Sequence, residues 1–231
     1  MGAFRQFVSG TGYKTDAEKS GKGGRIYGDD SVWRQKPELT WRNPGFSQSD
    51  EHPVMQVSWN DAVAFCQWLG AKEGTACRLP TEAEWEYACR AGTETLWCNG
   101  NDPDRVAEVG NLLDASAKAD FPTHGRIASS TSDSYPYTAP VRRFRCNAFG
   151  LYDMHGNAFE WCNDRYHPGY YAKSPLHDPS GPDSGQSRVR RGGSWLHNVL
   201  FSYSAFREGS ETPDSQACTT GFRVAWTIPT P

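Results

Sequence analysis

The stretch that decides the fold is Arg78-Leu79-Pro80-Thr81-Glu82-Ala83-Glu84-Trp85-Glu86-Tyr87-Ala88. Thr81 and Glu84 have the spacing of a capping box, in which each side chain accepts a hydrogen bond from the other residue's backbone N–H. Pro80 precedes this box, and Gly92 supplies a C-terminal stop. The pattern therefore predicts a helix that starts at Thr81. Its expected packing residues are Ala83, Trp85, Tyr87 and Ala88.

Two further helices are predicted on the N-terminal side of this stretch. Ser58 and Asp61 come close to a second capping box, and Gly70 and Gly74 loosen the end of the helix that follows. Apolar residues then recur at helical spacing. They are Ala62, Phe65, Cys66 and Leu69. A shorter helix is predicted over Ala3 to Val8, ending near Gly10 and Gly12.

The rest of the chain indicates loops and short strands. The predicted strands cover residues 52–57, 138–144, 188–191 and 222–226. A polar, Gly-rich run over residues 14–45 carries Trp33 and Trp41 as expected anchors. No internal repeat, low-complexity linker or break in composition marks a boundary, so one domain is predicted over residues 1–231.

Composition supports a loop-rich fold. The chain has nine Trp, 23 Gly and 15 Pro in 231 residues, and only 37% of its residues are hydrophobic. Loops in such a chain must be held by bound metal ions, buried Trp or buried ion pairs.

The net charge of −3 gives no electrostatic reason to expect nucleic acid or an anionic membrane as partner. No apolar run reaches the roughly 18 residues of a membrane span, and the first residues contain no secretory hydrophobic region.

Seven cysteines are scattered without CxxC spacing, which argues against a zinc or thioredoxin-like site. An odd number of cysteines without a signal peptide favours reduced thiols in a cytoplasmic protein. Most of them are expected to be small buried hydrophobic residues.

Four segments, taken together, resemble the formylglycine-generating enzyme, or sulfatase-modifying factor, family. They are residues 78–88, 147–161, 188–195, and 212–215 continuing through 221–225. The resemblance extends over nearly the whole chain. It implies an α+β fold: an irregular, loop-rich variant of the C-type lectin fold, with two short helices packed on small antiparallel sheets. Family members usually carry a strand or hairpin ahead of the Ala3–Val8 helix, so an N-terminal strand is expected to be missing or trimmed.

The resemblance also implies one or two structural calcium ions, because it places oxygen donors at two groups of positions. The first group is the side chains of Asn111 and Asp133 with the carbonyls of Leu112 and Tyr135. The second group is the side chains of Asp153 and Glu160 with the carbonyls of Gly156 and Ala158. Without the resemblance, the preferred interpretation is that Asp153 and Glu160 are solvated loop acids and that Asn111 is a turn residue.

In the family's oxidase, two cysteines five residues apart follow a Gly-Gly-Ser motif and bind copper(I). Copper(I) activates dioxygen there to oxidise a substrate cysteine to formylglycine, and it prefers soft thiolate ligands. This chain has His197 at the first cysteine position and Ser202, or Val199 in a shifted alignment, at the second. It is therefore identified as a family variant that lacks the catalytic cysteine pair, so copper binding is not expected. A His197–Cys218 pair is the remaining candidate for a metal or a reactive thiolate.

Other residues around this motif are expected to build the frame. Gly192 and Gly193 allow close backbone approach or positive φ before a strand. Arg207 and Arg223 are expected to pair with buried acids such as Asp214. The acids Glu82 and Glu86 share a helix face, but no partner suggests acid–base catalysis.

Three functions remain open. The first is a ligand-binding module with a protein or peptide ligand in a cleft around residues 195–220. Its expected contact residues are Trp195, His197, Asn198, Phe201, Ser202, Tyr203 and Cys218. Relatives among the variable proteins of diversity-generating retroelements diversify the residues after Gly-Gly-Ser-Trp, and residues 196–204 and 217–220 use only amino acids accessible to that process.

The second function is an oxidoreductase of the formylglycine-generating type, acting on a cysteine of a sulfatase-like substrate. The third is a non-catalytic paralogue that binds such peptides without modifying them. Binding is preferred over catalysis, and the protein is expected to be a bacterial, cytoplasmic monomer.

Overall fold

The computed structural model describes residues 1–28, 30–118, 120–121 and 132–227. Its α-helices are α1 (Gly2–Thr11), α2 (Asp16–Ser20), α3 (Trp59–Glu73) and α4 (Glu82–Arg90). Its 3-10 helices are η1 (Pro103–Glu108), η2 (Ala115–Lys118), η3 (Tyr170–Ala172) and η4 (Val199–Ser202). The strands are β1 (Gly24–Tyr27), β2 (Trp33–Lys36), β3 (Cys77–Arg78), β4 (Phe159–Arg165), β5 (Arg188–Arg191), β6 (Thr220–Gly221) and β7 (Ala225–Trp226).

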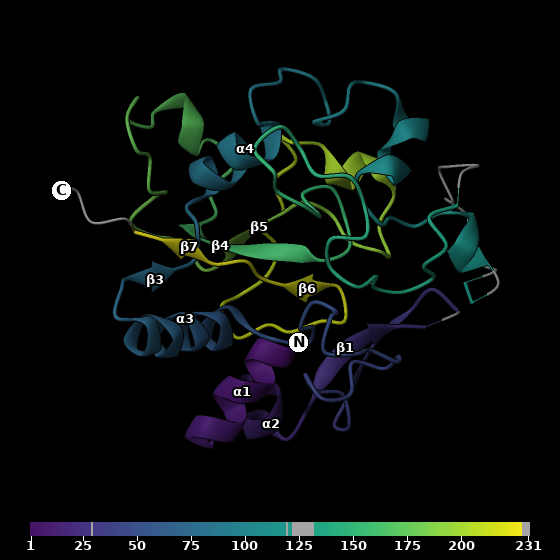
Figure 1. Ribbon diagram of the computed structural model, residues 1–231. Coiled ribbons are helices and arrows are strands. Elements are labelled where there is room, and N and C mark those ends of the chain that lie inside the picture. Colours follow the sequence, from purple (N-terminus) through teal and green to yellow (C-terminus); the bar gives the residue numbers. More distant parts are fainter. Residues whose placement is uncertain (29, 119, 122–131, 228–231) are drawn as a thin grey trace.

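A three-stranded sheet in the order β5–β4–β6 lies at the centre of the molecule. In Figure 1, α1, α2 and α3 lie on one side of this sheet, and α4 lies on the other with many of the long loops. Two further antiparallel pairs are β1–β2 and β3–β7. The predicted irregular α+β fold is confirmed. It differs in detail from the expectation of two helices and antiparallel sheets, because four α-helices form and β4 pairs with β6 in parallel.

Local sequence signals locate the helices well. Both predicted capping boxes form: the Ser58 side chain accepts from the N–H of Asp61, and the Thr81 side chain from that of Glu84. α2 begins with a third capping box, formed by Thr15 and Glu18, that the sequence analysis missed. The left-handed residue that ends α4 is Ala91, one position before the predicted Gly92.

Two predicted strands do not form. Residues 52–57 are irregular because Gln56 has a φ of 58° and its side-chain amide donates to the carbonyls of Arg25 and Pro44. Residues 138–144 are irregular because the side-chain amide of Asn157 hydrogen-bonds to both the backbone N–H and the carbonyl of Ala139. Of the predicted 222–226 strand, only β7 forms. The predicted strand over residues 188–191 is confirmed as β5.

Buried tryptophans anchor the loops. The Trp side chains that are at most 1% exposed are Trp41, Trp85, Trp97, Trp161 and Trp195. Two aromatic predictions were wrong: Trp33 is 41% exposed at the tip of the β1–β2 hairpin, and Tyr87 is 69% exposed on the outer face of α4. The buried positions of α4 are instead Glu82, Trp85 and Cys89. Within the described part of the chain, no helix is long and apolar enough to cross a membrane.

The helix caps give a first prediction. Replacing Thr81 with Ala leaves the N–H of Glu84 without its side-chain acceptor, so the free energy of unfolding should fall by about 1 kcal/mol. A thermal melt should show the midpoint lowered by roughly 2–4 °C. Thr227→Ala, at an exposed position outside any helix, is the matched control and should leave the melt unchanged. An equal effect of both substitutions would contradict the capping role.

Candidate ligand-binding face and cation sites

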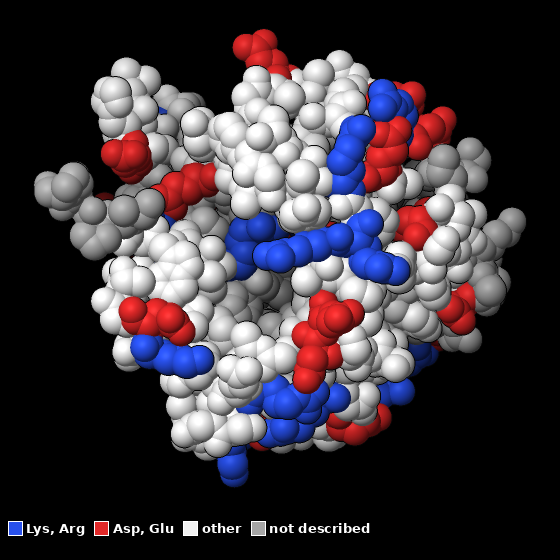
Figure 2. All heavy atoms as spheres, viewed as in Figure 1, with Lys and Arg blue, Asp and Glu red and all other residues white. Residues whose placement is uncertain are grey.

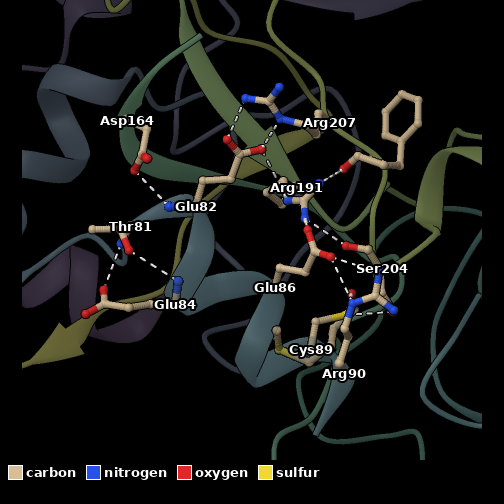
Figure 3. A network of polar contacts seen from close by, with 12 residues as sticks. Thr81, Glu82, Glu84, Glu86, Cys89, Arg90, Asp164, Arg191, Ser204 and Arg207 are labelled. Atoms are coloured by element: carbon tan, nitrogen blue, oxygen red, sulfur yellow. Dashed lines mark hydrogen bonds and ion pairs between the residues drawn. The ribbon is translucent and has the colours of Figure 1, made fainter. Parts of the chain in front are cut away.

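A buried ion-pair network joins α4 to β5 (Figure 3). The Arg191 side chain is completely buried, and its guanidinium donates to Glu86 and to the carbonyls of Ser204 and Phe206. Glu82 lies beside it, with its carboxylate 3.7 Å from Arg191 Nε, and accepts two hydrogen bonds from Arg207 at 2.6 and 2.8 Å. The network thus ties α4 and β5 to the segment that follows β5.

Gly192 and Gly193 turn the chain directly after this network. Their φ angles are 95° and 77°, in the left-handed region that favours glycine. A Cβ on Gly193 would lie 3.0 Å from the Cβ of Ser202, so the glycine also lets η4 pack against the turn. Both functions predicted for this pair, positive φ and close approach, are present.

The next residues fold back on themselves. Ser194 Oγ lies 2.6 Å from His197 Nδ1, and the side chain of Asn198 caps η4 by accepting from the N–H of Leu200. At the end of η4, Ser202 Oγ donates to the Val199 carbonyl and accepts from the indole N–H of Trp97 at 2.9 Å.

Burial divides the predicted contact residues into two groups. Leu200 is 53% exposed and Phe201 is 38% exposed, while His197, Asn198 and Tyr203 are partly exposed. We call these five residues the 197–203 face. The His197 ring packs edge-on against the rings of Phe159 and Phe201, at 4.8 and 5.3 Å between centroids.

Three predicted contact residues need correction. Trp195, Ser202 and Cys218 are each 0% exposed, so they support the 197–203 face from below and present no surface to a ligand. The physical reason is that Trp195 donates its indole N–H to the Cys218 carbonyl inside an apolar cluster with Leu113 and Phe121. The sequence pattern could not separate the buried residues of this segment from its exposed ones.

Cys218 does not have the surroundings of a reactive thiol. Burial raises the pKa of its thiol to about 12, so it stays protonated at neutral pH. Over the residues that the structure describes, no group of three or more His, Cys, Asp and Glu side chains could hold a metal ion.

The ion pairs around the motif also correct the sequence analysis. Arg207 pairs with Glu82, and Arg223 pairs with Glu160 through two hydrogen bonds at 2.5 and 2.7 Å. Asp214, the predicted partner, is exposed and instead accepts from the Thr212 hydroxyl. Buried acids do pair with these arginines, as predicted, but they come from α4 and β4.

The first predicted cation position is built around Asn111, which is completely buried. Its amide N–H donates to the Tyr137 carbonyl at 2.7 Å, while its Oδ1 is buried without a hydrogen-bond partner. Asp133 accepts from the N–H groups of Leu112 and Tyr135, and burial, reinforced by the charge of Asp114, raises the pKa of Asp133 to about 7. An unpartnered oxygen beside a desolvated carboxylate is an arrangement that a hard cation would stabilise.

The second predicted cation position also contains a buried oxygen without a hydrogen-bond partner. Asp153 Oδ2 accepts from the N–H of Arg142 at 2.9 Å, while Asp153 Oδ1 is buried without a partner. The Glu160 carboxylate is more fully engaged, because Arg223 and the indole N–H of Trp85 together make three hydrogen bonds to it. A carboxylate has about four lone-pair positions, so one remains for a cation. Gly156, with a φ of 123°, packs against the Asn111 carbonyl and so connects the two positions.

A cavity of about 660 Å³ opens beside the second position. Its walls include Asp153, Glu160 and Arg223 on one side, with Met1 and Phe65 among its other lining residues. Figure 2 shows this hollow near the N-terminus, with basic side chains above it and acidic side chains below it.

The sequence analysis missed one functional polar group, the imidazole of His155. This ring is completely buried; its Nε2 accepts from the N–H of Cys98 at 3.0 Å and its Nδ1 lies 2.9 Å from the Ser202 carbonyl. Burial lowers the pKa of His155 to about 4, so the ring is neutral and its Nδ1–H donates to Ser202. The histidine therefore holds the end of η4. Its place within residues 147–161 was the only signal for it in the sequence.

Comparison with known proteins identifies the family. The family model described as "Sulfatase-modifying factor enzyme 1-like domain" matches residues 1–228. The formylglycine-generating enzyme of Streptomyces coelicolor is 37% identical, over 96% of this chain and 74% of that protein. The chain belongs to the sulfatase-modifying factor family. The predicted family resemblance is confirmed.

Other members of this family differ in how they are described. The mouse protein named inactive C-alpha-formylglycine-generating enzyme 2 is 33% identical, over 96% of this chain and 70% of its own length. Among solved structures, PvdO from Pseudomonas aeruginosa superposes with a TM-score of 0.72 and 27% identity, over 97% of this chain and 76% of that one. Treponema denticola variable protein 1 superposes with a TM-score of 0.62 and 25% identity, over 78% of this chain and 73% of that one.

The buried network gives a second prediction. Glu82→Gln removes the charge that Arg191 and Arg207 share, so two desolvated guanidinium groups lose a partner. Breaking a buried ion pair in this way costs about 3–5 kcal/mol, and urea unfolding should show a loss of that size. Glu108→Gln removes two exposed ion pairs, with Arg105 and Arg145, and should leave the unfolding midpoint in place. A loss below about 1 kcal/mol for Glu82→Gln would contradict the central role of this network.

The Asp164 carboxyl gives a third prediction, on pH. It accepts from the N–H of Glu82, its other oxygen is buried without a partner, and burial raises its pKa to about 6. Between about pH 4 and pH 6 the folded chain retains a proton that the unfolded chain releases, so the stability of the native protein falls as pH rises. Asp164→Asn avoids this cost. The free energy of unfolding of this variant, minus that of the native protein, should rise by about 2 kcal/mol between about pH 4 and pH 6 and stay level at higher pH. A pH-independent difference in urea unfolding would contradict the raised pKa.

Proposed function

We propose that this domain is a calcium-stabilised binding module of the sulfatase-modifying factor family that lacks oxidase activity. Its ligand is a protein or peptide that contacts the 197–203 face. The observation that carries the proposal is the loss of both thiols from the segment after Gly193. His197 stands at the first cysteine position, and Ser202, or Val199 in a shifted alignment, stands at the second. The Ser202 hydroxyl is already hydrogen-bonded to Trp97 and Val199.

The residues present do not fit copper(I). A copper(I) site needs soft thiolate ligands, and the one thiol in the supporting cluster, Cys218, is buried and stays protonated at neutral pH. His197 Nδ1 faces Ser194, and the serine and histidine together supply only harder donors. We therefore infer no oxidation step at this segment.

The names of two relatives are consistent with a role other than oxidation. One family member is described as an inactive enzyme, and a variable protein shares the fold. The 197–203 face is built as a binding surface would be: exposed Leu200 and Phe201 stand on a base fixed by Trp195, Ser202 and His155. Exposed aromatic and aliphatic side chains on a rigid base suit contact with another protein. Whether residues 196–204 and 217–220 are diversified remains a sequence prediction.

The oxygens without partners support calcium at both predicted positions. Asn111 Oδ1 and Asp153 Oδ1 are the kind of neutral and anionic oxygen that calcium ligates, and each lacks any other partner. A bound calcium ion would hold together the segments at residues 111–112, 133–135 and 153–160, and it would take no part in chemistry.

Calcium gives a fourth prediction. Adding calcium at 100 times its dissociation constant should raise the stability by about 2.7 kcal/mol, because only the folded chain presents the site. A melt in chelator should therefore occur at a lower temperature than a melt in calcium. Asn111→Leu and Asp153→Ala should each weaken the response, whereas Asn60→Ala, on α3, should retain it. An identical melt with and without calcium would show that neither position binds it.

The binding face gives a fifth prediction. Peptides selected on the purified domain should bind at least 10-fold more weakly to Phe201→Ala, because removal of a hot-spot aromatic side chain costs 2 kcal/mol or more. Leu176→Ser is the matched control, since Leu176 is 95% exposed but far along the chain from this face. Turnover of a cysteine-containing sulfatase peptide in the presence of copper and dioxygen would overturn the proposal in favour of the oxidoreductase.

A further inference from the structure

Two thiols that the binding function does not use lie against each other. Cys66 lies on α3 and Cys77 on β3, and both are free cysteines. Cys66 is 2% exposed in an apolar cluster with Leu79 and Trp161, and the partly exposed Cys77 packs against the same cluster. The two thiols are close enough that Cys77 contributes to raising the pKa of the Cys66 thiol, in addition to its burial.

A glycine on α3 makes this approach possible. Gly70 lies one turn after Cys66, and a Cβ placed there would be 3.5 Å from the Cβ of Cys77 and 2.9 Å from the carbonyl oxygen of Thr75. Positions four apart on a helix have Cβ atoms about 5–6 Å apart, so Cys77 lies beside the helix face that carries Cys66. A disulfide requires a Cβ–Cβ distance of about 3.5–4.5 Å. The approach of Cys77 to Gly70 and its packing on the cluster that contains Cys66 make the two cysteines neighbours from which this distance can be reached.

We propose that Cys66 and Cys77 form an oxidative modification site, at which a small-molecule disulfide such as oxidised glutathione converts the two thiols to an intramolecular disulfide. The Cys77 thiol, which is the more accessible, loses its proton to solvent, and its sulfur attacks the small disulfide. One small thiolate leaves, and a mixed disulfide forms on Cys77. The Cys66 thiol then loses its proton and attacks the Cys77 sulfur, which expels the second small thiolate. The protein loses two electrons and two protons, and the small disulfide is reduced to two thiols.

The environment of the pair determines its rate and its effect. Burial raises the pKa of both thiols, so the exchange is slow at neutral pH and becomes faster as pH rises. The bond would join α3 to the β3–β7 pair. Phe65 and Leu69, on either side of Cys66 along α3, line the 660 Å³ cavity, so the same bond would fix one wall of that cavity.

The test uses the full chain, folded, with oxidised glutathione at about pH 8.5, where thiolates begin to form. The intact mass should fall by the mass of about two hydrogens, and the product should carry no covalently bound glutathione. Peptide mapping should find residues 66 and 77 linked. The thermal midpoint should rise by several degrees because the bond closes a short loop in the unfolded chain. Reduction should reverse both changes.

Three variants separate the two steps. Cys66→Ala should trap glutathione on Cys77, because no resolving thiol remains, and Cys77→Ala should show neither glutathione nor a bond at Cys66. Cys146→Ser, at a partly exposed cysteine elsewhere, should behave as the native chain does. Glutathione that remains attached to Cys77 in the native chain would overturn the proposal. It would also be overturned if Cys77 stayed reduced in the folded chain and was oxidised only in the urea-unfolded chain. Melts of the variants establish that each is folded.

Discussion

The rest of this structure depends on the burial of one charge, the guanidinium of Arg191. A buried charge is tolerated only where it is paired, and here the partners come from α4 and from the segment after β5. Among the described residues, the guanidinium Nε of Arg191 makes no hydrogen bond and faces the Glu82 carboxylate as an ion pair. The requirement fixes the distance between a helix and a strand that lie on different parts of the chain. It also fixes the carbonyls of Ser204 and Phe206, and so the C-terminal end of the 197–203 face is held. An apolar contact in the same place would bury as much surface but would not specify those carbonyl positions.

How much of the structure could be predicted from the sequence depends on how far apart along the chain the interacting residues lie. The starts of α3 and α4 were predictable because a capping box involves residues three apart. Arg207 pairs with Glu82, 125 positions away, and no local pattern could choose Glu82 over the nearby Asp214. The two absent strands failed for a related reason. Gln56, within one predicted strand, uses its side-chain amide to satisfy a backbone carbonyl of a distant loop. Asn157 does the same for Ala139, within the other predicted strand, so neither segment needs a strand partner there. The candidate site was located by its motif, but its exposed and buried residues alternate without a helix or strand period, and burial was therefore not predictable there.

The copper(I) chemistry that the family resemblance implies and the calcium binding proposed above place different demands on the chain, so one could be absent while the other is present. Copper(I) would require thiolates at two defined positions, and His197 together with Ser202 or Val199 supplies none there. The cation positions use an amide, carboxylates and backbone carbonyls that also serve the loops structurally. Asn111 donates to Tyr137, and its own carbonyl accepts from Asn157, whether or not a cation is present. Loss of Asn111 would therefore cost loop structure as well as a ligand.

The consequence for function lies in how the 197–203 face is supported. Ser202 and Trp195 have become part of the interior, where Trp97, His155 and Cys218 hold them by directed hydrogen bonds. The side chains of Leu200 and Phe201 point away from that interior and bear none of its polar contacts, so they can vary in size and polarity at little cost to stability. An oxidase needs fixed ligands at the bottom of this segment, whereas a binding surface needs a fixed base and variable side chains above it. The division between buried and exposed residues found here meets the second requirement.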